Sequence, residues 1–463
     1  MAPFRTRLAR VLLATLPSLL SVGLAAGSDD PGWIGVGSCA ATACHGGRRE
    51  PLDLKGSEYS FWGSYDPHTR AFSVLFDDRS RRIEKNLKKL ADIDTARPFE
   101  NDLCLKCHVH QEYDTTARRP GLPSFENADG VGCESCHGPA ARYLVPHAQA
   151  GWPGLSDRQK LEGFGMRPTK DLLARGQICA ECHVGKGAAD VNHDLIAAGH
   201  PRLGFEYGSQ LAKLPKHWRT RDDRARHPDY EAKVWALGQI STARAALGLL
   251  EARAIRAIPD DSASPWPEFA EYSCFSCHHD LAPAPRLRAD NRPGQAPWGT
   301  WSLPRAGSMA SNFLGAEVPA LGPLRELMSR PTADPAVVAR RARAASDELG
   351  HRADAINRGL IRPADVRSLL ADSLKGEPEA SPLDWDLAAQ RYLAIVALDK
   401  AMAESDPRFL GPKVRIGLDR MLADLDLPIR AEPRGALFDS PRRFNPARIN
   451  DDLRAVREAI PRP

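Results

Sequence analysis

The chain has 463 residues, ten cysteines and a formal net charge of +4, from 63 basic and 59 acidic side chains. This length is enough for one large domain or two ordinary ones. Because the charges nearly balance, the composition argues against the strongly basic surface of a nucleic-acid-binding protein, and no nucleic-acid partner is expected.

Residues 1–27 have the pattern of a secretory signal peptide. A basic stretch, an apolar run and small residues follow one another, namely Arg5, Arg7 and Arg10, then 11–24, then 25–27. The apolar run is short for a transmembrane helix. We expect cleavage and a periplasmic or otherwise exported protein. The alternative is an uncleaved anchor, and membrane association is expected only in that case. Without the three arginines the mature chain has a net charge near +1.

All ten cysteines fall into five motifs that end in a histidine. Four motifs are C-x-x-C-H, and the first has four residues between its cysteines. The motifs consist of Cys39, Cys44 and His45; Cys104, Cys107 and His108; Cys133, Cys136 and His137; Cys179, Cys182 and His183; and Cys274, Cys277 and His278. Two thiols about one helical turn apart reach both vinyl groups of a porphyrin, and the next histidine then lies below the iron. The pattern predicts five haems c, attached through thioethers.

Other readings of single motifs stay open. A lone C-x-x-C-H can be half of a zinc site or a redox dithiol. The longer Cys39–Cys44 spacing also suits a local disulfide in an exported protein. The complete use of cysteine in five such motifs favours haem attachment for all of them.

The chain changes character along its length, and we predict a mainly α fold. Residues 28–285 are expected to form a pentahaem domain with few regular elements, in which Asp66 and Pro67 begin a short helix. A long helix is predicted at 231–255. Residues 286–305 are a connector rich in Pro, Gly and Trp. In the C-terminal region, 306–463, apolar stripes predict a helical bundle that packs on the 231–255 helix. Its helices are expected near 335–349, 363–375, 384–404, 413–426 and 446–459.

Nine histidines remain as candidates for the second axial position of the five irons: His68, His110, His147, His193, His200, His217, His227, His279 and His351. Methionine is scarce, so pairs of histidines are the expected ligands, and these favour low redox potentials. By context we select His68, His147, His193, His200 and His217 as distal ligands. If residues 193–200 are helical, His193 and His200 point the same way and serve two haems. For each of them an ordinary buried or surface histidine is the alternative.

Parts of the sequence resemble the multihaem cytochromes c of the cytochrome c-554 type. The matching segments are Ser38–Gly46, Asp66–His68 and Gly130–Pro139, and Asn192–Pro201 resembles related multihaem cytochromes. The resemblance covers roughly residues 35–285. It implies a mainly helical fold, stacked haems, largely bis-histidine ligation and electron transfer, and one haem of that type can lack a strong sixth ligand. This chain departs from the type in its fifth motif and its long C-terminal region.

The leading hypothesis is therefore an exported protein that transfers electrons between other redox proteins, such as cytochromes or membrane oxidoreductases. No catalytic residue is predicted. The alternative is a multihaem oxidoreductase that acts on nitrite, nitric oxide or hydroxylamine at one open-coordinate haem, although the chain has no C-x-x-C-K motif. A third hypothesis, compatible with the first, is that the C-terminal helices form a docking module.

Overall fold

The computed structural model describes residues 32–47, 54–109, 127–259, 264–274, 278, 297–303, 318–330, 332–374, 385–403, 411–425, 427 and 444–460. The predicted signal peptide and most of the predicted connector lie outside these residues, as do His110, Cys277 and His279. Within the described residues the fold is mainly α, as predicted, and extended segments pair only at two isolated bridges. No helix in this part of the chain is long and apolar enough to cross a membrane.

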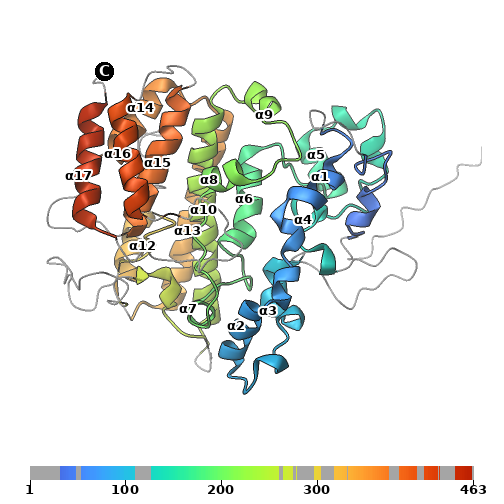
Figure 1. Ribbon diagram of the computed structural model, residues 1–463, viewed down its shortest axis with the longest axis horizontal. Coiled ribbons are helices and arrows are strands. Elements are labelled where there is room, and N and C mark those ends of the chain that lie inside the picture. Colours follow the sequence, from blue (N-terminus) through green and yellow to red (C-terminus); the bar gives the residue numbers. More distant parts are fainter. Residues whose placement is uncertain are drawn as a thin grey trace, which may run out of the picture.

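The N-terminal half consists of short helices joined by turns (Figure 1). Its α-helices are α1 (Glu58–Tyr65), α2 (Asp78–Lys88), α3 (Asp102–His108), α4 (Cys133–His137), α5 (Asp157–Phe164), α6 (Leu172–His183), α7 (His193–Ala197), α8 (Tyr207–Lys213) and α9 (Thr220–Arg226). Single 3₁₀ turns lie between them and beyond them: η1 (Val36–Cys39), η2 (Pro67–Arg70), η3 (Ser73–Phe76), η4 (Ile93–Thr95), η5 (Pro98–Glu100), η6 (Asn127–Asp129), η7 (Pro146–Ala148), η8 (Trp152–Gly154) and η9 (Phe269–Glu271).

The C-terminal half is a bundle of longer helices, on the opposite side of the molecule from α1–α5 (Figure 1). The helices are α10 (Tyr230–Arg256), α12 (Leu321–Met328), α13 (Pro335–Arg358), α14 (Pro363–Ser373), α15 (Trp385–Ala403), α16 (Pro412–Leu425) and α17 (Pro446–Ala459). All six predicted helices of this half are present. The helix expected at 335–349 continues to Arg358, and α12 was not predicted.

Helix α10 is the central element of the bundle. It packs along α13 and also contacts α15, α6 and α8. Its contact with α8 is close, because a Cβ on Gly238 would lie 2.6 Å from Cβ of Tyr207. The predicted packing partner of the C-terminal helices also contacts α6, the helix that ends in the fourth of the five motifs.

The two halves differ in how much apolar side-chain core they contain. One continuous apolar cluster joins α6, α8 and α10 to the C-terminal helices. Among the described residues of the N-terminal segment, the second cluster has only Ile34, Ala140 and Tyr143 at its centre. Such a small core would not hold a segment of this length together, which is consistent with a segment that folds around large prosthetic groups.

Ion pairs and tryptophans fasten the segment after His200 to the bundle. Arg202 donates two hydrogen bonds of 2.8 Å to the buried carboxylate of Asp386 on α15. Thr300 Oγ1 donates to the same carboxylate, and Trp301 Nε1 donates to the carbonyl oxygen of Phe205 at 2.9 Å. The bundle thus fixes the backbone that carries His200. The division into domains at 285 and 305 stays a prediction.

Candidate functional site

Three of the cysteine motifs lie on short helices, where residues three and four positions apart share one face. Helix α3 ends at His108, α4 spans Cys133–His137 and α6 ends at His183. The side chains of Asn101 and Asp171 accept hydrogen bonds from backbone amides in the first turns of α3 and α6, which fixes where these helices begin.

Gly138 ends α4 immediately after His137. Its φ is +84°, a region that favours glycine, and a Cβ there would lie 2.2 Å from the carbonyl oxygen of Gly165. The chain after the third motif therefore needs glycine in order to turn.

The first motif is held against the third by one buried carboxylate. The backbone amides of Ile34, Gly35 and Ala140 all donate hydrogen bonds to Glu134, at distances of 2.7–3.2 Å. Burial raises the pKa of Glu134, and these amide hydrogen bonds oppose the shift. The thiols of Cys39 and Cys133 also share a hydrogen bond. The two motifs therefore form one unit.

The nine described cysteines are all free. Cys39 and Cys44 are among them, so the structure contains no disulfide between these two residues. Within the described chain, no group of three or more His, Cys, Asp or Glu side chains is arranged to hold a metal ion. The histidines predicted as ligands come together instead as opposed pairs.

In four places the histidine that ends a motif faces one of the histidines selected as distal ligands. The ring-centroid distances and interplanar angles are 6.1 Å and 12° for His45 and His147, 6.3 Å and 57° for His137 and His217, 6.1 Å and 88° for His183 and His68, and 6.1 Å and 22° for His278 and His193.

These distances match two imidazoles on opposite sides of one metal ion. An imidazole nitrogen binds a transition metal at about 2 Å, and the ring centre lies about 1 Å farther back, so opposed rings have centroids about 6 Å apart. Ordinary contacts between aromatic rings also have centroids about 4.5–7 Å apart, so it is the recurrence of one separation at four motif histidines that favours a shared metal geometry. The donor set therefore fits a bis-histidine iron.

For His108 and His200 no ring contact is recorded among the described residues, but the two lie close enough for their charges to interact. Burial lowers the pKa of His200, and the nearby charge of His108 lowers it further. Helix α7 ends at Ala197, and Gly199 follows with φ of +117°. The stretch from His193 to His200 is therefore not one helix, because the chain turns before His200. His193 and His200 nevertheless lie near the histidines of two different motifs, His278 and His108 respectively.

The Nδ1 atoms of five of these histidines are occupied by hydrogen bonds. The partners are Glu58 Oε2 for His45 (2.9 Å), Asp66 Oδ1 for His68 (2.8 Å), the Ala71 carbonyl oxygen for His108 (2.6 Å), the Leu144 carbonyl oxygen for His147 (2.6 Å) and the Pro201 carbonyl oxygen for His200 (2.8 Å). An acceptor at Nδ1 fixes the proton there and leaves Nε2 free to bind a metal.

Burial keeps several of these imidazoles neutral. Burial lowers the pKa of His137 to about 4, with a contribution from the charge of His217. Burial also lowers the pKa of His183 to about 4, with a contribution from His68. Because a metal binds the neutral imidazole, such histidines are ready to act as ligands at neutral pH.

A buried ion pair positions the loop that carries His217. Arg175 on α6 donates to Asp223 on α9 at 3.0 Å, and its guanidinium lies over the Trp218 ring at 4.9 Å from the centroid. Trp218 Nε1 donates to the same carboxylate at 2.9 Å. His217 Nδ1 is buried and has no hydrogen-bond partner among the described residues.

The remaining histidines are placed elsewhere or lie outside the described residues. His351 is exposed on α13, and His227 is half-buried beyond the end of α9. No ring contact with a motif histidine is recorded for either of them in the described part of the chain. His110 and His279 lie outside it.

Glu58 and Asp66 were missed as partners of ligand histidines. Asp66 was expected only to begin a helix, and its carboxylate does accept a hydrogen bond from the backbone amide of His68. Its second role was readable from the sequence Asp66-Pro67-His68, which folds the carboxylate back on the ring. Glu58 lies thirteen residues after His45, and nothing local in the sequence marks it.

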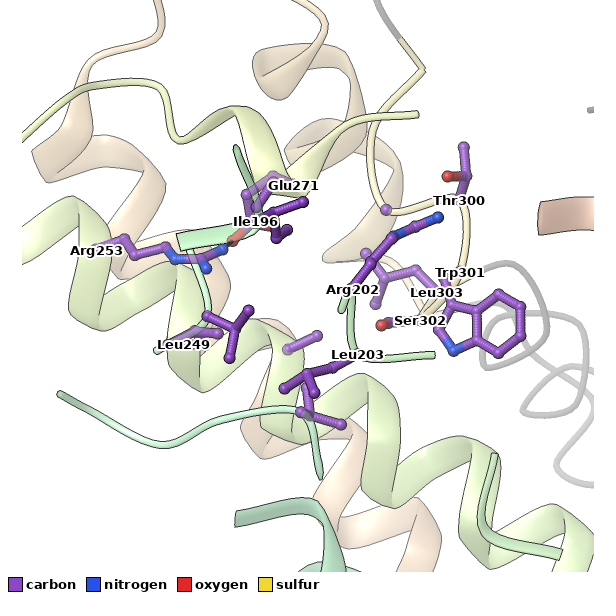
Figure 2. A pocket seen from close by; sticks show the side chains of 15 residues that line it. Ile196, Arg202, Leu203, Leu249, Arg253, Glu271, Thr300, Trp301, Ser302 and Leu303 are labelled. Carbon is purple, nitrogen blue, oxygen red and sulfur yellow. Dashed lines mark hydrogen bonds and ion pairs between the residues drawn. The ribbon is translucent and has the colours of Figure 1, made fainter. Parts of the chain in front are cut away.

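A small cavity lies beside the fourth motif, between α10 and the segments 200–203 and 297–303 (Figure 2). Its volume is ≈ 80 Å³, below the range of about 300 Å³ or more that is typical of ligand pockets. Its charged groups are paired: Arg253 reaches toward Glu271 at 2.6 Å and also bonds Asp190 (Figure 2). We interpret it as an internal cavity beside the buried ion pairs.

Comparison with known proteins agrees with this site. Residues 39–138, which contain three of the five motifs, match the family model "Cytochrome c554 and c-prime". A relative, cytochrome c-554 of Nitrosomonas europaea, is 29% identical over 160 residues, which is 32% of this chain and 60% of the relative. The chain thus spans less than two thirds of that relative's length. No solved structure matches. The N-terminal part of the chain therefore resembles a multihaem cytochrome of the c-554 type.

Proposed function

We propose that this chain is an exported electron-transfer protein that carries five covalently attached haems c, each bound by two histidines. The ten motif cysteines would form the thioethers. The axial pairs would be His45 with His147, His108 with His200, His137 with His217, His183 with His68, and His278 with His193. The observation that carries the proposal is the opposition of four such pairs at 6.1–6.3 Å.

The haem supplies one-electron chemistry between ferric and ferrous iron. The protein's part is to hold the ligands. Glu58, Asp66 and backbone carbonyl groups accept hydrogen bonds from the Nδ1–H groups. These hydrogen bonds fix both the tautomer and the orientation of each ring. Rigid ligands on both sides keep the site unchanged between the two oxidation states.

Contacts between motifs support a continuous route for electrons. Thiols of the first and third motifs share a hydrogen bond, as do Cys107 and Cys182 of the second and fourth motifs. Cys136 of the third motif lies close enough to Cys179 and Cys182 of the fourth for their charges to interact. Since each thiol would be bonded to a haem edge, these contacts favour the order first, third, fourth and second motif.

The partners would be other redox proteins, as is expected for a relative of a cytochrome c-554. We place the protein in the periplasm or an equivalent exported compartment, because covalent haem attachment and the N-terminal sequence both favour export. Membrane association would need an uncleaved signal.

The alternative function is a multihaem oxidoreductase that acts on a small nitrogen compound. It needs one iron with an open position. The histidine partners found for the motif histidines favour the carrier, because a closed iron must lose a ligand before it binds a substrate.

Intact mass spectrometry of the exported protein tests the haem number. We expect five haem additions, and four in a Cys39→Ser/Cys44→Ser variant, which removes both thioethers of the first site. The proposal of five haems is wrong if the unaltered protein carries four and its Cys39 and Cys44 still react with an alkylating reagent.

A further inference from the structure

Helix α2 and the residue that follows it carry a high density of positive charge. Residues 78–89 contain six basic and two acidic side chains, a net charge of +4 on a chain whose total is also +4. At 3.6 residues per turn, Arg81, Lys85 and Lys88 fall on one side of the helix, and Arg82 and Lys89 border it. This stripe, defined by these five residues, is the basic face of α2.

The opposite side of α2 is bonded to the segment that precedes His200. Asn86 Nδ2 donates to the carbonyl oxygen of Ala198 at 3.0 Å, and Arg79 donates to that of Gly199 at 3.2 Å. Ile83 lies against Gly199. These contacts bind the inner side of the helix to the protein. The basic face lies on the outer side, where Arg82, Lys88 and Lys89 are exposed and Arg81 and Lys85 are half-buried.

Helix α2 is also bonded to the segment that carries His108. Glu84 is 2% exposed, and it accepts hydrogen bonds from the backbone amide of Arg97 and from Asn101 Nδ2, the latter at 3.1 Å. Asn101 in turn caps α3, which ends at His108. One helix therefore holds both histidine-bearing segments of the second site.

Among the residues that the structure describes, most charges on the basic face have no ion-pair partner. Lys88 pairs with Glu84 at 2.7 Å, yet half of its side chain stays exposed. For Arg81, Arg82, Lys85 and Lys89 no ion pair is recorded among the described residues. Next to the helix, Val74 and Phe76 are 39% and 44% exposed. Exposed apolar side chains beside unpaired charges are typical of a protein recognition surface. The apolar core packs against the partner, and the charged rim steers the partner as it approaches.

We propose that the basic face of α2 is the docking surface for an acidic redox protein, which exchanges electrons at the site of His108 and His200. This inference rests on the proposed electron-transfer function and adds the chemistry of the partner. An acidic protein fits because the charge is spread along a whole helix rather than gathered into a pocket for a small anion. A charged surface of this kind raises the association rate and makes it sensitive to salt.

The test uses the holoprotein and reduced flavodoxin, an acidic one-electron donor, in anaerobic stopped-flow experiments at low and high ionic strength. We expect the second-order rate constant to fall by about tenfold or more with added salt. The variant Arg81→Glu/Arg82→Glu/Lys85→Glu/Lys89→Glu should lose about tenfold or more at low ionic strength and lose the salt dependence.

The matched control is Arg340→Glu/Arg341→Glu/Arg358→Glu/Arg415→Glu, which makes the same change in net charge at exposed positions of α13 and α16. These helices belong to the C-terminal bundle rather than to the N-terminal part that contains α2 (Figure 1). We expect this control to stay within about threefold of the unaltered protein, because it changes the net charge without removing the positive charges of the basic face. A variant with glutamine at the same four positions of α2 should give an intermediate rate. Because it removes the positive charges without adding negative ones, it controls for misfolding of the glutamate variant.

A neutral flavin semiquinone separates failure of the docking proposal from failure of the proposed function. If it reduces all variants equally fast, the electron-transfer function stands, and equal flavodoxin rates in the α2 variant and the control then overturn the docking surface. If it reduces none of them, the proposed function itself is wrong. Loss of binding to anionic phosphatidylserine vesicles in the α2 variant, with unchanged flavodoxin kinetics, would overturn the protein partner in favour of a lipid surface.

Discussion

The imidazole rings of His45 and His147 lie nearly parallel, with planes 12° apart and centroids 6.1 Å apart. His68 and His183 have the same separation, but their planes are 88° apart. For a low-spin ferric iron, parallel axial imidazoles split the iron d orbitals strongly and give a rhombic EPR spectrum. Perpendicular ones give a nearly axial spectrum with a large maximal g value. Irons bound by these two pairs would therefore belong to two spectroscopically distinct classes.

We therefore predict that His147→Ala removes a rhombic low-spin signal, whereas His68→Ala removes the signal with the largest g value. Each substitution should convert one haem to high spin, since the iron loses one axial ligand. Low-temperature EPR of the oxidised holoproteins measures both effects. His351→Ala, at an exposed position on α13, is the control and should leave the spectrum unchanged. An unaltered low-spin spectrum in both ligand variants would show that these pairs do not bind iron.

The carboxylate of Glu58 accepts a hydrogen bond from Nδ1 of His45 at 2.9 Å. A carboxylate partner makes a ligand imidazole more basic and favours ferric over ferrous iron. We predict that Glu58→Gln raises the potential of one haem by about 60 mV, the one-electron equivalent of a tenfold change in that preference.

Spectroelectrochemical titration measures this shift. EPR at each potential identifies the site of His45 and His147 as the rhombic signal that is missing in His147→Ala, which separates it from the other near-parallel pair, His278 and His193. The matched control is Glu162→Gln on α5, where the carboxylate is exposed and pairs only with Arg158. If both variants titrate like the unaltered protein, the carboxylate does not tune the site.

The local elements of the site could be predicted from the sequence because each has its own short signal. The helices that carry the motifs, the turn that begins at Asp66 and Pro67, and the long helices with apolar stripes all depend on neighbouring residues. The end of α13 was missed because Gly350 interrupts the pattern, yet a Cβ there would lie 3.0 Å from the Arg244 guanidinium, so the glycine allows α10 and α13 to pack closely.

Pairings across the chain could not be predicted in the same way. The five distal histidines were selected from their contexts, but nothing local states that His147 faces His45 or that His68 faces His183. These pairings depend on how the N-terminal segment folds over distances of many residues. The hydrogen bond between Glu58 and His45 and the ion pair between Arg175 and Asp223 were missed for the same reason.

If the protein carries electrons, few of its irons should have a free axial position at which carbon monoxide can bind. We predict that carbon monoxide added to the reduced holoprotein perturbs the spectrum of at most one haem, because four motif histidines have a histidine opposite them and His200 lies near the fifth, His108. His200→Ala should create one additional binding site at the iron of His108, while His227→Ala should not. Rapid binding to the unaltered protein, together with turnover of nitrite or hydroxylamine at about 1 per second or more, would favour the oxidoreductase.

Asp223 is fully buried beneath Trp218 and bonds Arg175, Arg226 and the indole nitrogen of Trp218. Burial alone would raise its pKa, but Arg175 and these other donors more than offset burial and hold the pKa below its usual value. A carboxylate with a depressed pKa stabilises the fold above its ordinary pKa, and this contribution is lost as the pH falls through the lower, folded-state value.

We predict that Asp223→Asn lowers the free energy of unfolding at pH 7 by about 3 kcal/mol, because it leaves Arg175 buried without a charged partner. It should also free the loop of His217 and convert a fraction of the third site to high spin. The loss of stability should begin to shrink below about pH 4, where the carboxylate of the unfolded chain takes up a proton, and vanish below the lower pKa of the native carboxylate. Thermal unfolding at pH 7 and at about pH 2.5, together with EPR at pH 7, measures both effects. Asp222→Asn, one residue earlier and 57% exposed, is the matched control and should change neither. A stability difference for Asp223→Asn that is the same at both pH values would show that the buried charge is not its origin.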